Sequence, residues 1–274
     1  MRKFLVGDRK MNIQKATSFV ENNGTAIEKY CLNFLLGKER NDRIPLTYLK
    51  GLQNNDGGFP YNNQKCRVSC INTTDVDLSL IIELELESSG VSRKVVDYLF
   101  WVQRNDGSWT ENEGIKQYDP PFWDLPNDLN TTIWLTANTT SLLVQMGYQN
   151  SGVVKRAAEF LLRNRDNHGR FAGFLLSTLI SVGVFGQLEG RDSDIVKKGL
   201  EILEENVEKL DSAWCLENLH VAGIPEERPV ARKCIEKLVA SQENDGSWKS
   251  DNGNEFTAYN TINVLKALRK YRIW

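Results

Sequence analysis

The sequence predicts an all-α fold, an (α/α)6 barrel or toroid in which six helical hairpins form an inner and an outer ring. Three observations support this prediction. The pattern Gln-x-Asn-Asp-Gly-(Gly/Ser)-aromatic occurs at 53–59, 103–109 and 242–248. Each copy follows a segment with the spacing of an amphipathic helix and precedes a segment that is apolar or small-polar nearly all round. Strand signals are absent, because no Asn-Gly pair lies between alternating β-branched runs.

The spacing of the repeats sets the number of hairpins. The last two copies are separated by about three periods of roughly 46 residues, so further repeats are expected between them. A degenerate copy of the repeat at 163–171 keeps the glycine and the aromatic residue. Near 205–206 only the predicted helix break remains. We therefore expect repeats over 44–271 and two helices within 12–43, which close a single domain spanning 1–274.

The helices are predicted in chain order from their apolar spacing. The segments expected in the outer ring are 13–20, 46–53, 92–103, 153–163, 193–205 and 229–242. The segments expected in the inner ring are 25–36, 75–88, 131–146, 172–185, 207–221 and 256–271. Gly90, Gly147 and Gly223 follow inner helices, where a left-handed residue commonly ends a helix. Within each repeat, Asp closes an Asx-turn and Gly takes a positive φ, so the outer helix ends there.

Length, charge and cysteine content restrict the class of protein. The 274 residues are enough for a large core, and a net charge of -2 gives no bulk attraction to nucleic acid. The longest apolar stretch, 171–186, contains polar residues and is shorter than the ~20 residues of a membrane span. Five cysteines, and an N-terminus (1–10) without the apolar core of a signal peptide, favour reduced thiols and a cytoplasmic location. Peripheral membrane contact and the oligomeric state stay open.

The repeated pattern Gln-x-x-Asp-Gly-Ser-Trp, at 103–109 and 242–248, resembles the QW motif of the terpene cyclase and protein prenyltransferase superfamily. This superfamily includes squalene-hopene and oxidosqualene cyclases. The three good copies and their spacing extend the likeness over most of 44–271. The resemblance implies an α/α barrel whose repeats tie the ends of outer helices to the starts of inner helices around an isoprenoid site. Full-length triterpene cyclases have two such domains, and this chain resembles one.

A metal site is not expected from this resemblance. Protein prenyltransferases hold zinc with an Asp and a Cys on one inner helix and a His on the last one. Asp211 and Cys215 resemble the first pair only loosely, and Asn260 stands about where the histidine belongs. A catalytic zinc has three protein ligands, so this set is incomplete. No Asp-Asp-x-x-Asp run for magnesium occurs either, so Mg²⁺ is relevant only if the substrate carries a diphosphate.

Class II terpene cyclases carry Asp-x-Asp-Asp at the start of an inner helix, and the middle acid protonates an alkene or epoxide. Residues 74–79 read Thr-Asp-Val-Asp-Leu-Ser, so two acids match and Leu78 replaces the third. The resemblance makes Asp77 the proton donor and Asp75 its supporting partner. Burial in an apolar hollow would keep Asp77 neutral until the substrate arrives. The alternative is an ordinary helix start, with Thr74 or Asp75 as the N-cap and Asp77 in the first turn.

Aromatic residues are candidates for binding a hydrophobic substrate. Trp134, Trp214 and Tyr259 lie near the starts of three predicted inner helices, where their faces would attract a carbocation. Core packing explains the same three residues. Residues 110–130 form a long loop rich in Pro, acidic and aromatic residues, which we interpret as a lid. The lid adds four residues to the predicted substrate site, namely Phe122, Trp123, Asp124 and Asp128.

The leading functional hypothesis is an isoprenoid-handling protein, most concretely a class II-like terpene cyclase that binds a hydrophobic isoprenoid and no nucleic acid. One alternative keeps the barrel as a non-catalytic isoprenoid-binding or lipid-binding protein, as Leu78 and Asn260 suggest. A second alternative is a carbohydrate-active enzyme, because (α/α)6 barrels also carry paired carboxylates across a groove.

Overall fold

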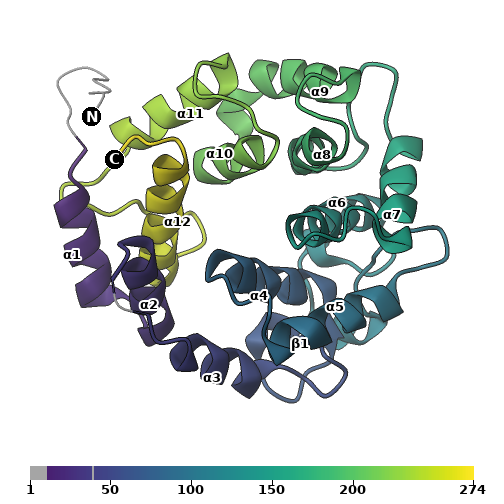
Figure 1. Cartoon of the computed structure of the whole chain (residues 1–274), viewed down its shortest axis with the longest axis horizontal. Helices are drawn as coiled ribbons and strands as arrows, with labels where there is room; N and C mark the ends of the chain where they lie inside the picture. Colours follow the sequence, from purple (N-terminus) through teal and green to yellow (C-terminus); the bar gives the residue numbers. More distant parts are fainter. Residues whose placement is uncertain (1–10, 39) are drawn as a thin grey trace. The chain divides into compact units, whose positions relative to one another are not determined.

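The structure is a computed structural model that describes residues 11–38 and 40–274. It consists of two compact units, one formed by the described residues up to Pro45 together with Leu203–Trp274, and one formed by Leu46–Ile202. Regular structure in the described residues is almost entirely helical (Figure 1), which confirms the all-α class. Closure into one barrel domain stays a prediction, and residues 1–10, where we expected no signal peptide, lie outside the described residues.

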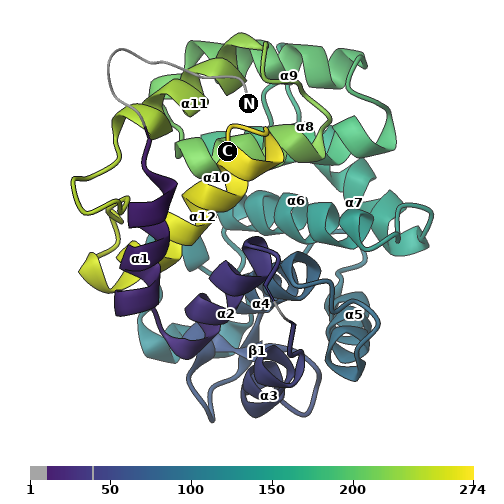
Figure 2. The same ribbon diagram turned by 60° about the vertical axis from the view of Figure 1, so that its left-hand side comes forward.

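In the Leu46–Ile202 unit, three buried helices pack in a row. They are α4 (Ile71–Glu83), α6 (Leu129–Gln145) and α8 (Leu175–Leu188). Helix α6 packs between α4 and α8, as Figures 1 and 2 both show. Amphipathic helices accompany this row, namely α3 (Arg43–Leu52), α5 (Gly90–Val102), α7 (Gly152–Arg163) and α9 (Asp194–Glu205).

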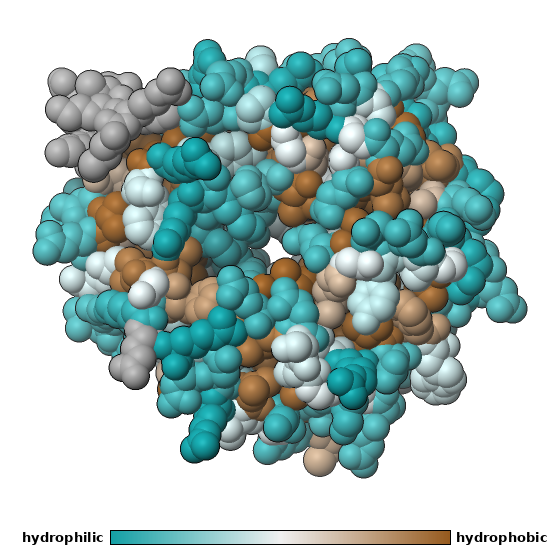
Figure 3. All heavy atoms as spheres, viewed as in Figure 1, coloured by the Kyte–Doolittle hydropathy of each residue, from teal (hydrophilic) through white to brown (hydrophobic). Residues whose placement is uncertain are grey.

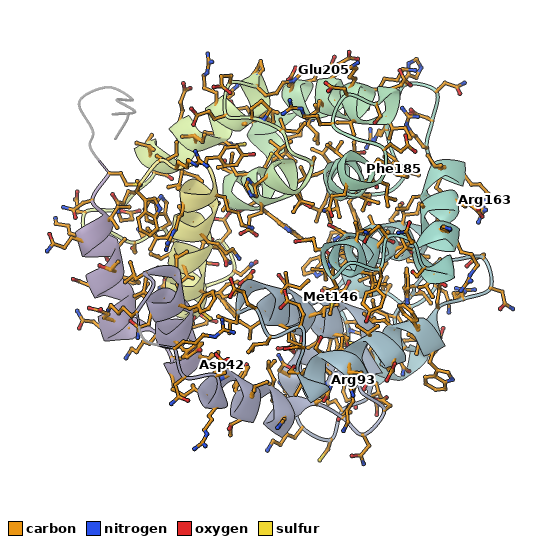
Figure 4. The ribbon with its side chains drawn as sticks, viewed as in Figure 1. Asp42, Arg93, Met146, Arg163, Phe185 and Glu205 are labelled. Atoms are coloured by element: carbon orange, nitrogen blue, oxygen red, sulfur yellow. The ribbon has the colours of Figure 1, made fainter. Side chains whose placement is uncertain are left out.

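The composition of each helix explains why it is buried or exposed. Helices α6 and α8 contain no charged residue, so they can pack against neighbours on all sides. Helix α7 instead buries one stripe that includes Val154, Ala157 and Leu161, and it carries charged residues between them. Figure 4 labels Arg163 on α7 and Phe185 on α8. Hydrophilic residues cover most of the face seen in Figure 3.

The other unit also combines buried and amphipathic helices. Its helices are α1 (Ile13–Asn23), α2 (Ala26–Leu35), α10 (Ser212–Val221), α11 (Pro229–Ala240) and α12 (Thr257–Lys270). Helix α12 packs against α1, α2 and α10, and α10 packs against α11. Across the described part of the chain, none of the helices combines the length and the apolar character needed to cross a membrane.

The repeat turns have the conformation that the Asp-Gly sequence predicts. Asp106 accepts the backbone N–H of Ser108 at 3.0 Å, and Gly107 takes a φ of 92°. A Cβ atom on Gly107 would lie 2.2 Å from the carbonyl oxygen of Arg156 in α7, so glycine is needed for this close approach. The same arrangement recurs in two other repeats, with Gly57 against Lys94 of α5 and Gly246 against Lys15 of α1.

The aromatic residue that ends each repeat connects an amphipathic helix to a buried one. The Trp109 indole N–H donates to the carbonyl oxygen of Leu99 in α5, at 2.8 Å. The Trp109 backbone N–H donates to Thr136 Oγ1 of α6, at 3.0 Å. The degenerate repeat at 163–171 has the equivalent of this second contact: the Phe171 backbone N–H donates to Thr178 Oγ1 of α8 at 3.1 Å. The repeats therefore connect amphipathic helices to buried ones, and the arrangement of these helices in two rings stays a prediction.

Some boundaries differ from the sequence prediction. Helix α4 begins four residues before the predicted 75 and ends at Glu83 rather than at 88. Helix α10 begins at Ser212 rather than at 207, after a separate 3-10 turn, Val207–Lys209. One short strand pair occurs within the all-α fold, in which β1 (Phe59–Pro60) pairs antiparallel with β2 (Ser69–Cys70). This short pair holds together the two ends of the segment that precedes α4.

The predicted glycine caps are confirmed at two of three positions. Gly147 and Gly223 follow α6 and α10 with φ values of 87° and 71°. Gly90 is the first residue of α5 rather than a left-handed cap, so that prediction is wrong. Glu85 takes the left-handed conformation after α4 instead, with a φ of 54°. The earlier end of α4 explains the change, because the cap moves with the helix end.

Candidate active site around helix α4

The N-terminus of α4 is capped by a residue from a different segment. The two carboxyl oxygens of Glu111 accept the backbone N–H groups of Ile71 and Asn72, at 2.8 and 2.7 Å. Because this external group satisfies N–H groups of the first turn, α4 can begin at Ile71, and Asp75 and Asp77 lie one turn inside it. The interpretation of Thr74 or Asp75 as an N-cap, with Asp77 in the first turn, is therefore wrong.

Asp75 is fully buried between α4 and α6. Its carboxyl accepts hydrogen bonds from Asn138 Nδ2 at 3.0 Å and from Thr139 Oγ1 at 2.9 Å. Burial raises the pKa of Asp75 to about 8, although both hydrogen bonds act in the opposite direction. Asp75 is therefore a neutral or partly neutral acid near pH 7, held in place by two side chains of the neighbouring helix.

Asp77 is 2% exposed and has a different environment from Asp75. Burial raises the pKa of Asp77 to about 7, although the Asn63 side chain acts in the opposite direction. Its Oδ2 atom is buried and has no hydrogen-bond partner among the described residues. Residues two apart on a helix point in different directions, so Asp75 and Asp77 do not face each other.

A second carboxyl pair lies at the start of α4. Asp124 is 3% exposed, and its Oδ1 atom accepts the Asn72 side-chain N–H at 3.1 Å. Asp124 also hydrogen-bonds Glu111, and burial raises the pKa of both carboxyls. Each carboxyl disfavours a charge on the other, so Asp124 adds to the effect of burial on the pKa of Glu111. Sequence reasoning included Asp124 and missed Glu111, which no local pattern distinguishes from other loop acids.

Of the other predicted site residues in the 110–130 loop, two are exposed and one caps a helix. Phe122 and Trp123 are 66% and 46% exposed in the 3-10 turn Phe122–Asp124. The Phe122 ring lies 6.1 Å from the ring of Phe174, which precedes α8. Asp128 is the N-cap of α6 and accepts the Thr131 backbone N–H at 2.9 Å. Because Asp124 contacts α4 and Phe122 contacts the residue before α8, this part of the 110–130 loop lies near the N-terminal ends of two buried helices, and its role as a lid stays a prediction.

The predicted aromatic residues have unequal exposure. Trp134 of α6 is 6% exposed, and its indole N–H has no partner among the described residues. In the other unit, Trp214 lies in the first turn of α10 and Tyr259 in the first turn of α12, with 37% and 50% exposure. Exposed aromatic side chains at helix starts are available for ligand contact, and their role in binding stays a prediction.

Three residues resemble parts of a zinc site in sequence, and each has another partner in the structure: Asp211, Cys215 and Asn260. Asp211 is the N-cap of α10 and accepts the Trp214 backbone N–H at 2.7 Å. The Cys215 thiol hydrogen-bonds the thiol of Cys234 within the core. Asn260 donates its side-chain N–H to the carbonyl oxygen of Lys249 at 2.8 Å. Within residues 11–38 and 40–274, no group of three or more His, Cys, Asp or Glu residues is placed to hold a metal ion.

Comparison with known proteins supports a terpene cyclase architecture. No protein-family model matches the sequence. A protein from Actinoplanes is similar over 94% of this chain and 98% of its own, with 16% identity and a TM-score of 0.65. The type II terpene cyclase MstE from Scytonema is similar over 93% of this chain and 97% of its own, with 15% identity and a TM-score of 0.59. The chain has the fold of type II terpene cyclases.

A shorter match in sequence, to a terpene synthase, supports the resemblance to the terpene cyclase superfamily. Stemod-13(17)-ene synthase of Oryza sativa subsp. indica is 31% identical over 111 residues, which cover 37% of this chain and 13% of the synthase. Other structures of MstE variants hold geranylgeranyl dihydroxybenzoate as substrate or merosterolic acid A as product. The terpene cyclase resemblance seen in the repeats is thus confirmed in the fold.

Proposed function

We propose that this chain is a class II-like terpene cyclase in which Asp77 protonates an alkene or epoxide of a polyprene. One observation carries the proposal: Asp77 is a buried carboxyl whose Oδ2 atom has no hydrogen-bond partner among the described residues. Burial gives it a pKa of about 7, so a large fraction is protonated at neutral pH. A general acid needs this combination, because its proton must be present and must not be bound to another acceptor.

Asp75 supports the proton donor through the helix rather than by direct contact. Its hydrogen bonds to Asn138 and Thr139 join the second turn of α4 to α6. Because Asp77 lies in the same part of α4, this connection fixes where its carboxyl points. A group that orients the acid increases the rate without binding the substrate itself.

The substrate class follows from the fold and from the aromatic side chains. MstE binds a geranylgeranyl compound, and by analogy a hydrophobic isoprenoid is the proposed ligand here. Trp134, in the same unit as Asp77, would guide the carbocation, since an aromatic face attracts a cation by about 0.5–2 kcal/mol. Trp214 and Tyr259 belong to the other unit and stay predictions from the sequence. Phe122 and Trp123 are exposed on the lid and would cover the bound chain.

The test is turnover of prenyl diphosphates, linear polyprenes and their epoxides by purified protein, followed by mass spectrometry of the products. Asp77→Asn keeps the shape of the side chain and removes the acid, so we expect turnover to fall roughly 10²- to 10⁴-fold. Asp211→Asn is the matched control, because Asp211 caps α10 and Asn is an equally good cap. Full turnover by Asp77→Asn, or no turnover of any of these substrates by the natural chain, contradicts the proposal.

A non-catalytic isoprenoid-binding protein is the second candidate, and Leu78 is the observation that favours it. Leu78 stands where the third acid of the class II pattern belongs and is fully buried in the core. Native mass spectrometry separates the candidates, since a bound unmodified lipid supports binding and a cyclised product supports catalysis. The carbohydrate alternative gains no support from Glu111 and Asp124, which hydrogen-bond directly, whereas paired glycosidase carboxyls stand about 5–9.5 Å apart.

A further inference from the structure

A cluster of charged side chains joins α10 to α12. The Glu217 Oε1 atom of α10 lies 3.0 Å from Lys266 Nζ and 3.7 Å from Lys270 Nζ, and both lysines belong to α12. The side chains of Lys266 and Glu217 are only 12% and 20% exposed, and that of Lys270 is partly exposed. Lysine and glutamate are seldom buried to this extent unless they are paired. One carboxylate therefore contacts two ammonium groups in a place with little solvent.

The formal charges of this cluster do not balance, because two lysines share a single carboxylate. Lys266 and Lys270 are four residues apart on α12, and like charges at this spacing destabilise a helix. The helix dipole favours Lys270, which is the last residue of α12, but Lys266 lies a full turn earlier. Glu217 Oε1 is buried and has no hydrogen-bond partner in the part of the chain that the structure describes, although both ammonium groups are close to it. The cluster therefore keeps an excess positive charge that a second anion would neutralise.

Two neighbouring side chains of the cluster are neutral. The Lys266 ammonium donates to Asn263 Oδ1 at 3.5 Å. Burial lowers the pKa of His220, and the Lys270 ammonium acts in the same direction, so the imidazole is neutral near pH 7. Neither neighbour supplies a negative charge, and Glu217 is the carboxylate on which the two lysines converge.

Two exposed aromatic residues share the helix sides that carry this cluster. Tyr259 is seven residues before Lys266, which is about two turns, so both lie along one side of α12. Trp214 is three residues before Glu217 and lies on the same side of α10 as that carboxylate. Helices α10 and α12 pack against each other (Figure 1), and the Tyr259 and Trp214 side chains are both exposed. The pair of helices therefore carries aromatic rings near the helix starts and an excess positive charge further along.

We propose that α10 and α12 form a binding site for an amphiphilic anion. Lys266 and Lys270 contact its carboxylate or phosphate group, because hydrogen bonds between charged groups are stronger than those between neutral ones. Trp214 and Tyr259 contact the apolar chain attached to that group. Glu217 pairs with the lysines in the absence of the ligand and competes with it for them. This site lies within one unit and involves no proton transfer, so it goes beyond the proposed function and does not depend on it.

The experiment is isothermal titration calorimetry of the full chain with decyl phosphate, decanoate and decanol, which share one apolar chain. We expect both anions to bind more tightly than the alcohol, and their comparison identifies the preferred charged group. Lys270→Gln removes one ammonium group and should weaken binding of the preferred anion roughly 10-fold. Glu217→Gln removes the competing carboxylate and should strengthen that binding roughly 10-fold. Lys249→Gln is the matched control, because Lys249 is an exposed lysine of the same unit that pairs with Glu243.

The opposite effects expected for Lys270→Gln and Glu217→Gln distinguish a binding site from an ion pair that only stabilises the fold. Decanol binding as tightly as the two anions, or anion binding that is unchanged in Lys270→Gln, overturns the proposal. An equal loss in Lys249→Gln also overturns it, because the loss would then follow from net charge alone. If Glu217→Gln does not fold, Lys270→Gln and its control decide the outcome. These binding measurements need no turnover, so their failure is separate from a failure of the mechanism proposed for Asp77.

Discussion

Four aspartates lie near the predicted starts of buried helices, and they have two different roles. Asp128 and Asp211 are N-caps, and each accepts a backbone N–H from the third residue after it, at 2.9 and 2.7 Å. Asp75 and Asp77 lie a full turn inside α4, are almost completely buried and cap nothing. The same residue type at the same kind of position is therefore structural in α6 and α10 and a candidate for chemistry in α4.

The difference arises from what caps each helix. Helices α6 and α10 are capped from their own sequence, whereas α4 is capped by Glu111, forty residues further along the chain. With the cap supplied from outside, α4 extends backward to Ile71 and the two aspartates move away from solvent. Burial then raises their pKa values, while a carboxylate at an exposed helix start has its anionic form favoured by the helix dipole.

The largest expected effect of this contrast is on the pH dependence of stability. Asp75 and Asp77 have pKa values of about 8 and 7 in the folded chain, above the ~4 of unfolded chains. A carboxyl with a raised folded pKa stabilises the fold fully below its unfolded pKa and loses that contribution as the pH rises through the folded pKa. We expect the free energy of unfolding to fall from about pH 4 to about pH 8, by up to about 1.4 kcal/mol per pH unit for each group.

Chemical denaturation at several pH values measures this slope. Asp75→Asn and Asp77→Asn should each flatten it, because the amide does not titrate. Asp128→Asn should leave the slope as it is in the natural chain, since Asp128 is a partly exposed N-cap whose role Asn can take over. Equal slopes for all four proteins would show that the buried aspartates are not protonated in the fold.

A smaller effect is expected from removing the external cap. Glu111→Ala leaves the buried N–H of Ile71 and the N–H of Asn72 without their acceptor, and we expect a loss of about 2–4 kcal/mol in the free energy of unfolding. Glu111→Gln keeps one acceptor oxygen and should lose less. Equilibrium unfolding in urea gives both values. If Glu111→Ala is as stable as the natural chain, the external cap does not explain the start of α4.

The repeats made most of the fold predictable from the sequence. The Asp-Gly turns, the helix order and most helix ends follow from contacts between residues a few positions apart, such as Asp106 with Ser108. The start of α4 was not predictable in this way, because it depends on Glu111 in a separate loop. The end of α4 was not predictable either. The left-handed residue that follows α4 is Glu85 and not Gly90, the glycine that the sequence suggested.

The candidate site was only partly predictable for the same reason. The resemblance to class II cyclases selected Asp75 and Asp77, and the composition of the lid selected Asp124. Their partners could not be found, because Asn138 and Thr139 are more than sixty residues from Asp75 and lie on another helix. Asn63 precedes α4 and gives no motif. Its left-handed backbone conformation, with a φ of 53°, and its effect on the pKa of Asp77 depend on the folded chain.

The smallest expected effect concerns the ordinary caps. Asp211→Ala removes the acceptor for the Trp214 backbone N–H at the start of α10, which should reduce the free energy of unfolding by about 1 kcal/mol. Asp211→Asn retains the cap and should be close to neutral. In both variants the free energy of unfolding should change with pH as it does in the natural chain, because Asp211 is not one of the buried carboxyls of α4. A change in that slope in Asp211→Asn would mean that an N-cap aspartate also contributes to the pH dependence of stability. The proposed difference between the aspartates of α4 and α10 would then be contradicted.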